Sequence, residues 1–141
     1  MPHALGDAFP VVVECCRRAR VRSFKVGRGI HGLLRPDKMI AYFDDVARLR
    51  DVAAALTHAL SGWPVHGVPF TTDLGGDGLV SWAVDPQGGA TGESWRAWLT
   101  ARLAAAVAAT AETPDDDRVE RVLGTVRRLG IDPDTWQPHD H

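Results

Sequence analysis

The spacing of apolar residues predicts an amphipathic helix in the middle of the chain. Between residues 46 and 60, apolar side chains recur every three or four positions, which places them on one face of an α-helix. Asp44 and Asp45 stand just before this pattern and can cap its first turn, because a carboxylate oxygen there accepts hydrogen bonds from free backbone N–H groups. Gly62 follows the last apolar position and suits the left-handed residue that commonly ends a helix.

A second helix is predicted over residues 95–111. Ser94 precedes the pattern and can cap it, and the alanine-rich sequence that follows has strong helix propensity. Trp98 and Leu99 fall on the apolar face, so we expect both in the core.

A third helix is predicted from the apolar positions between residues 119 and 129. Residues 113–117 (TPDDD) form an acidic linker and cap before it, because negative charge is favourable at a helix N-terminus. Residues 134–141 are expected to fray, as chain ends commonly do.

Alternating patterns predict short strands. Residues 20–26 alternate with a period of two, so Lys25 has a definite direction on a strand. Residues 38–43 (KMIAYF) indicate a buried strand, and residues 68–71 and 78–84 indicate a hairpin.

The N-terminal region fits two structures. Pro10 suits the first turn of a helix, whereas the valines at positions 11–13 suit a strand equally well. Cys15 and Cys16 are adjacent and cannot link distant parts of a secreted fold, and no further cysteine or well-spaced histidine completes a metal site. We interpret them as buried thiols.

This order of elements is typical of an α+β fold rather than of regular βα alternation. We expect a small, mostly antiparallel sheet packed with two to three helices. The 141 residues, 45% of them hydrophobic, suffice for one domain with a proper core. We place this domain at residues 1–112, with the basic strand-loop-strand inside it, and assign residues 113–141 to the acidic linker, the C-terminal helix and the tail.

Several classes of protein are disfavoured. No apolar run reaches the roughly 18 residues of a membrane span, and the N-terminus lacks the order of regions found in a secretory signal. We therefore expect a cytoplasmic protein without a membrane partner. The glycine pattern G-R-G-I-H-G at residues 27–32 is a weak match to nucleotide-binding loops, so no cofactor is predicted.

Half of the cationic side chains lie in one stretch of 22 residues. Residues 17–38 contain 8 of the 16 lysines and arginines, and Asp37 is the only acid among them. This stretch carries +7 and the rest of the chain −9, which gives the net charge of −2. The stretch is either a solvated basic face or a surface that attracts an anionic partner. Nucleic acid is disfavoured because the whole chain is acidic and aromatic residues are not interleaved with the cations.

Five short sequence motifs follow one another along the middle of the chain: F-K-V at residues 24–26, R-P-D-K-M-I-A-Y-F at 35–43, P-F-T at 69–71, L-V-S-W-A-V-D-P at 79–86 and S-W-R-A-W-L-T-A-R-L-A at 94–104. In this order and spacing, residues 20–110 resemble the C-terminal half of the HopA-type effector family. That family is related to phosphothreonine lyases, and its bacterial members occur in peptide-tailoring clusters such as thioamitide and class V lanthipeptide pathways.

The resemblance implies β-elimination of phosphate from phosphoserine or phosphothreonine in a ribosomally made peptide. Such a reaction needs a neutral amine to remove the α-proton and cations to hold the phosphate. On the resemblance, Lys25 in F-K-V is the expected base. His31 is a candidate acid or phosphate donor because it is the only histidine within the basic stretch, in the glycine-rich loop between the strands. The remaining candidates are cations expected to bind phosphate or substrate: Arg22, Arg28, Arg35, Lys38 and Arg102.

One part of the family pattern has no counterpart before Phe24, namely the strand that carries the general-acid histidine. If the chain is a lyase, we expect the missing part to come from another polypeptide, such as a kinase-like protein or a complementary lyase half, or from a second copy of the chain. The alternative is a noncatalytic subunit that binds a precursor peptide or a partner through the basic strand and the hairpin edge. Five tryptophans in so small a chain also fit a covered interface.

Overall fold

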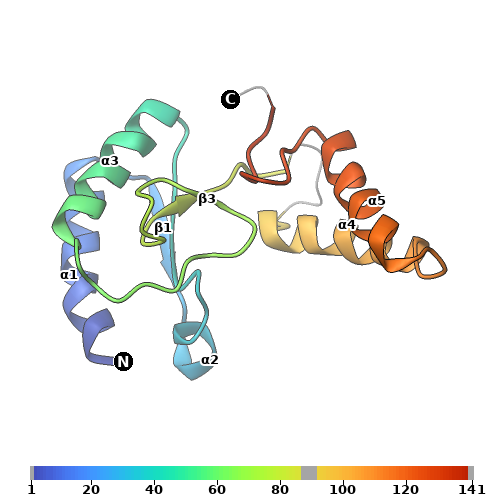
Figure 1. Ribbon diagram of the computed structural model, residues 1–141. Coiled ribbons are helices and arrows are strands. Elements are labelled where there is room, and N and C mark those ends of the chain that lie inside the picture. Colours follow the sequence, from blue (N-terminus) through green and yellow to red (C-terminus); the bar gives the residue numbers. More distant parts are fainter. Residues whose placement is uncertain (1, 87–91, 140–141) are drawn as a thin grey trace. The chain divides into compact units, whose positions relative to one another are not determined.

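The computed structural model describes residues 2–86 and 92–139. The chain divides into two compact units, which are described separately (Figure 1). The first consists of Met1–Pro69 and Asp73–Ser81, and the second of Phe70–Thr72 and Trp82–His141. The boundary predicted after residue 112 lies inside the second unit.

The described residues contain five helices and two antiparallel pairs of strands, which confirms the α+β class. One strand pair consists of β1 and β2, and the other of β3 and β4. In chain order the elements are α1 (Pro2–Arg18), β1 (Ser23–Val26), α2 (Gly29–Leu33), β2 (Met39–Tyr42), α3 (Val46–Ala59), β3 (Thr72–Asp73), β4 (Ser81–Trp82), α4 (Trp95–Ala109) and α5 (Asp115–Arg128).

The N-terminal region is a helix, which decides between the two structures that its sequence allows. Helix α1 begins at Pro2, so Pro10 lies in its interior and not in its first turn. A proline in a helix interior costs about 3 kcal/mol, because it removes one hydrogen bond and crowds the preceding turn. Burial of Ala8, Val12 and Cys16 on one face of α1 offsets this cost. Cys16 is buried as predicted, whereas Cys15 is only half-buried.

The core of the first unit forms where α1 meets α3 and the β1–β2 sheet. Leu60 is buried with the apolar face of α1, and Met39 and Ala41 of β2 pack against the same cluster. The predicted cap of α3 is confirmed: Asp45 accepts a hydrogen bond at 2.8 Å from the backbone N–H of Ala47.

The strands are shorter than their sequence patterns suggest. Strand β2 is half-buried with an exposed end, so the prediction of a buried strand is wrong. Met39 and Ile40 point to opposite sides of the strand pair and are both only half-buried, so neither side of β2 is fully enclosed. Strand β3 begins at Thr72, just after the predicted residues 68–71.

The second unit is organised around tryptophan. Trp95, Trp98 and Leu99 of α4 are buried with Val126 of α5, and the two tryptophan rings stack with centroids 5.5 Å apart. Trp82 is buried as well. Trp63 and Trp136 are partly buried and pack against the two core clusters. All five tryptophans thus belong to the chain's own cores, so their number does not by itself indicate an interface.

The segment after α5 is docked, and the prediction that it frays is wrong up to residue 139. The ring of Trp136 meets that of Phe70 edge-to-face, with centroids 5.0 Å apart. The hydroxyl of the buried Thr72 donates a 2.8 Å hydrogen bond to the carbonyl oxygen of Thr135. Aromatic packing and a half-buried hydrogen bond together hold this segment against the second core.

None of the helices in the described part of the chain is long and apolar enough to cross a membrane.

Replacement of Leu99 by alanine tests the core of the second unit. Leu99 has 0% exposure, so Leu99→Ala should lower the free energy of unfolding by about 2–5 kcal/mol through lost burial and a cavity. The matched control is Leu34→Ala, because Leu34 is 75% exposed and its removal should change stability by less than about 0.5 kcal/mol. Urea unfolding followed by tryptophan fluorescence measures both, and equal effects would contradict the assignment of this core.

Candidate functional site

The register of β1 and β2 decides which side chains share a face. Lys25 pairs with Ile40, and Ser23 pairs with Tyr42. Directly paired residues of antiparallel strands point to the same side, and Met39 and Ala41 of the opposite side pack on the core. Lys25 therefore points away from the core of the first unit.

Lys38 extends this uncovered side by one position. Its carbonyl oxygen accepts a 2.7 Å hydrogen bond from the backbone N–H of Gly27, so the strand pairing continues past β2. Alternation along the strand then puts Lys38 on the side of Ile40. We call the five residues of this side the outer face: Ser23, Lys25, Lys38, Ile40 and Tyr42.

Lys25 is exposed, and its ammonium group lies over an aromatic ring. The Nζ atom is 5.1 Å from the centroid of the Tyr42 ring, within the range of a cation–π contact. Lys25 has two diagonal neighbours on this face, Tyr42 and Lys38, one on each side of its direct partner Ile40. Diagonal neighbours lie about 7–8 Å apart. Two flexible ammonium groups at this separation can reach one phosphate-sized anion.

Two of the predicted phosphate ligands already have carboxylate partners. Arg35 donates two hydrogen bonds to Asp37, at 2.9 and 2.8 Å, and this contact raises the pKa of Arg35 above its ordinary value. Arg22 lies 3.9 Å from a carboxylate oxygen of Asp44, with both side chains exposed. These pairs reduce the positive charge available to a ligand.

His31 and Arg28 lie on the connection between β1 and β2, and both are exposed. His31 belongs to the short helix α2 and does not lie in an open loop, as the glycine pattern suggests. The backbone of Gly27, just after β1, comes very close to that of Gly32, which lies within α2. A Cβ on Gly27 would lie 2.3 Å from the carbonyl oxygen of Gly32. Only glycine fits such an approach, so these residues determine the path of the connection.

Arg102 belongs to the second unit and interacts with its own helix. Its guanidinium lies over the Trp98 ring, 4.0 Å from the centroid, and donates a 3.0 Å hydrogen bond to the Trp98 carbonyl oxygen. Both contacts hold Arg102 against the tryptophan cluster, which is a structural role.

Glu14 is an acidic residue of this region that the sequence analysis missed. It accepts hydrogen bonds from Arg17 at 2.8 Å and from Arg18 at 2.7 Å along α1. These hydrogen bonds lower the pKa of Glu14 from 4.5 to about 2. Glu14 lies just before the basic stretch. Its spacing of three and four residues from the two arginines predicts ion pairs along a helix, and this pattern can be seen in the sequence.

Only half of the basic stretch is therefore free of carboxylate partners. Four of its eight cations form ion pairs, namely Arg17, Arg18, Arg22 and Arg35. Among residues 2–86 and 92–139, the other four have no carboxylate within ion-pair distance: Arg20, Lys25, Arg28 and Lys38. Two of these, Lys25 and Lys38, lie together on the outer face, which makes this face the best candidate site in the first unit.

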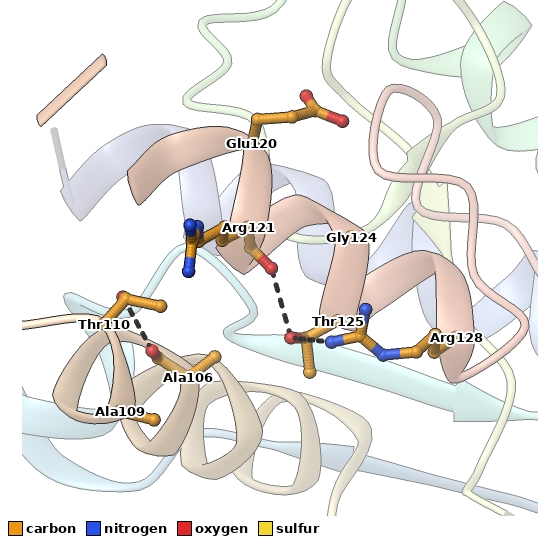
Figure 2. A pocket seen from close by; sticks show the side chains of 8 residues that line it. All are labelled: Ala106, Ala109, Thr110, Glu120, Arg121, Gly124, Thr125 and Arg128. Carbon is orange, nitrogen blue, oxygen red and sulfur yellow. Dashed lines mark hydrogen bonds between the residues drawn. The ribbon is translucent and has the colours of Figure 1, made fainter. Parts of the chain in front are cut away.

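Lys25 lines neither of two open hollows in the described residues. One, of about 200 Å³, lies in the first unit and is lined by Leu34, Pro36, His66, Gly67 and Pro69. The other, of about 460 Å³, lies between α4 and α5 in the second unit (Figure 2). On the outer face, Lys25 and Tyr42 are exposed, whereas Lys38 and Ile40 are half-buried.

Three comparisons, with protein-family models, with curated proteins and with solved structures, give no match to this chain.

The pKa of Glu14 can be tested directly. We expect the carboxyl group to titrate in carbon-detected NMR with a midpoint near pH 2, well below its ordinary 4.5. A lowered pKa means that the ion pairs favour folding fully above pH 4.5 and lose this effect as the pH falls toward 2. Arg17→Gln with Arg18→Gln should return the midpoint toward 4.5, and Arg50→Gln on α3 should leave it unchanged. A wild-type midpoint near 4.5 would show that the pairs do not persist in solution.

Proposed function

We propose that the outer face binds the phosphate of a phosphorylated peptide, and that the chain is one part of a phosphoserine or phosphothreonine β-eliminating lyase assembly. The observation that carries this proposal is the β1–β2 register, which places Lys25 and Lys38 on the face that points away from Met39 and Ala41. A phosphate dianion attracts both ammonium groups, and a peptide in extended form can run along the adjacent strand edge.

The elimination uses the two lysines differently. Lys38 holds the phosphate, and Lys25 as a neutral amine takes the α-proton of the phosphorylated residue. The electrons of the broken Cα–H bond form the Cα=Cβ double bond, and the Cβ–O bond breaks as phosphate leaves. His31 or a residue of the partner protonates the departing phosphate, and nearby cations stabilise its charge.

A partner is part of this proposal because Lys25 is exposed. An amine becomes a base when burial or neighbouring cations destabilise its charged form, and a covering surface would supply that burial. Ile30 and Leu34, on the connection between the two strands, are 68% and 75% exposed. Such apolar side chains at the tip of a basic segment fit coverage by a second polypeptide or a second copy.

The noncatalytic subunit remains the second candidate, and the contact between Lys25 and Tyr42 favours it. An aromatic ring attracts the ammonium ion far more than the neutral amine. The observed contact therefore suits a lysine that binds phosphate better than one that removes a proton. In this second function the chain recruits a phosphorylated precursor peptide or an acidic partner without chemistry.

Substitutions of the two lysines separate binding from catalysis. Lys38→Ala should weaken binding of a phosphothreonine peptide about 5- to 10-fold, the effect of losing about 1–1.4 kcal/mol of charge-assisted contact. Lys25→Arg should keep the charge and bind within about threefold of wild type, yet abolish elimination, because guanidinium does not give up its proton. Fluorescence anisotropy measures binding, and mass spectrometry detects the dehydrated product with the partner present.

Arg50→Gln is the matched control, because it removes one exposed cation from α3 of the same unit and should alter neither quantity. Equal binding by wild type and Lys38→Ala would reject the outer face as the phosphate site. Normal binding without product, for wild type and Lys25→Arg alike, would establish the noncatalytic function. A further expectation is weaker binding at higher salt, because exposed charges are screened over about 10 Å at 0.1 M.

A further inference from the structure

The second unit contains a groove between α4 and α5 whose residues have no part in the outer face. It is an open hollow of about 460 Å³ (Figure 2). Two of its lining residues come from α4, one is the residue that caps α4, and five come from α5: Ala106, Ala109, Thr110, Glu120, Arg121, Gly124, Thr125 and Arg128.

Two arginines give this groove its charge. Arg121 and Arg128 are seven residues apart on α5, so they lie on one side of the helix with Cα atoms about 10.5 Å apart along its axis. In the part of the chain that the structure describes, neither has a carboxylate within ion-pair distance. Glu120, the acid that lines the groove, forms a 2.5 Å ion pair with Arg127, and its side chain extends away from Thr110 (Figure 2).

The hydrogen bonds in the groove leave both guanidinium groups able to bind more. Arg128 donates a single 2.8 Å bond to the hydroxyl of Thr125, which keeps the arginine folded back along α5 (Figure 2). Thr125 and Thr110 donate in turn to carbonyl oxygens of their own helices. A guanidinium carries five N–H donors, so most of those on Arg128 remain available to a ligand.

The floor of the groove is made of small residues, and one of them is unfavourable for the helix. Gly124 lies inside α5, where glycine is about 1 kcal/mol less stable than alanine. A Cβ at this position would meet only the guanidinium of Arg128, at 3.7 Å, which is an ordinary contact. The packing of the two helices therefore does not require glycine here, and its effect is to keep the floor low between the arginines.

We propose that this groove binds an acidic α-helical segment of a partner polypeptide. The small side chains of Ala106, Ala109 and Gly124 let a third helix approach to the usual 8–10 Å between axes. Carboxylates seven residues apart on that helix repeat with a rise of about 10.5 Å, the same as the rise between the Cα atoms of the two arginines along α5. Each would form a charge-assisted contact with one guanidinium.

The positions of the arginines favour a helix over a single phosphate ion. Figure 2 shows that Arg121 extends away from Thr125, whereas the guanidinium of Arg128 is folded back to Thr125 and lies 3.7 Å from the position of a Cβ on Gly124. One small anion would contact one arginine, whereas an elongated acidic ligand contacts both and covers the apolar floor between them. The acidic residues 115–117 of a second copy are an alternative occupant, which the experiment below separates.

A designed peptide tests the proposal with the full-length chain. The probe is an alanine-rich helix of about 18 residues, long enough to be helical, with two glutamates seven positions apart and neutral ends. Its control carries glutamine at both positions. Isothermal titration at low salt should give at least tenfold tighter binding of the glutamate peptide, because both ion pairs are lost in the control.

Variants of the chain locate the binding. Arg121→Gln and Arg128→Gln should each weaken binding about 5- to 10-fold, and Gly124→Leu should prevent it by filling the floor. Arg50→Gln is the matched control, because it removes one exposed cation of α3 outside the groove, and it should bind within about twofold of wild type. Circular dichroism checks the fold of each variant, and the arginine variants keep the test valid should Gly124→Leu unfold.

Five results would overturn the proposal. Equal affinity for the two peptides, or an equal loss of affinity in Arg50→Gln and Arg121→Gln, would show that the groove does not recognise carboxylates. No binding at low salt would exclude an acidic helix. Sedimentation that shows a dimer broken by Arg121→Gln would assign the groove to a second copy. Displacement of the peptide by equimolar inorganic phosphate would show a simple anion site.

Discussion

Burial of apolar side chains on one side only is the constraint on which both units depend. In the first, α1 and α3 cover one side of the β1–β2 sheet, and Met39 and Ala41 anchor that side to the core. In the second, the tryptophan cluster packs α4 against α5 through Leu99 and Val126. In a chain this small, the core buries one side of each helix or sheet and leaves the other side at the molecular surface. The outer face of the sheet and the groove between α4 and α5 are the uncovered sides, and both candidate sites lie there.

The parts of the fold that the sequence predicts are those decided by nearby residues. The cap of α3 by Asp45 and that of α4 by Ser94 act within three residues, so pattern and capping residue together locate both helices. The docked tail could not be predicted in this way. It depends on the contact of Trp136 with Phe70, residues far apart in the sequence, and no local signal specifies such a pair. The sequence predicts a helix that begins at Pro10, because proline is common in a first turn, whereas α1 begins at Pro2.

In the candidate site, too, local features can be predicted from the sequence and long-range ones cannot. Alternation along β1 predicts that Lys25 has a definite direction, but only the register with β2 shows that Lys38 shares it. Nor does the charge of the basic stretch show which cations are paired, because Glu14 precedes it and Asp44 follows it. The groove in the second unit was not predicted at all. From the sequence alone, Gly124 is a residue that lowers the stability of its helix. That it lines a groove is visible only in the structure, where α4 lies beside α5.

The pairing of cations, rather than their number, directs the functional interpretation. An arginine that already contacts a carboxylate, as Arg35 and Arg127 do, must give up that partner before it binds another anion. A cation without such a partner keeps its full attraction, and exposure lets a ligand reach it without structural change. In each unit two such cations lie on one uncovered side: Lys25 and Lys38 on the sheet, Arg121 and Arg128 on α5. The lysines are diagonal neighbours on the sheet, whereas the arginines are two helical turns apart on α5, so we expect the two candidate sites to prefer anions of different shape.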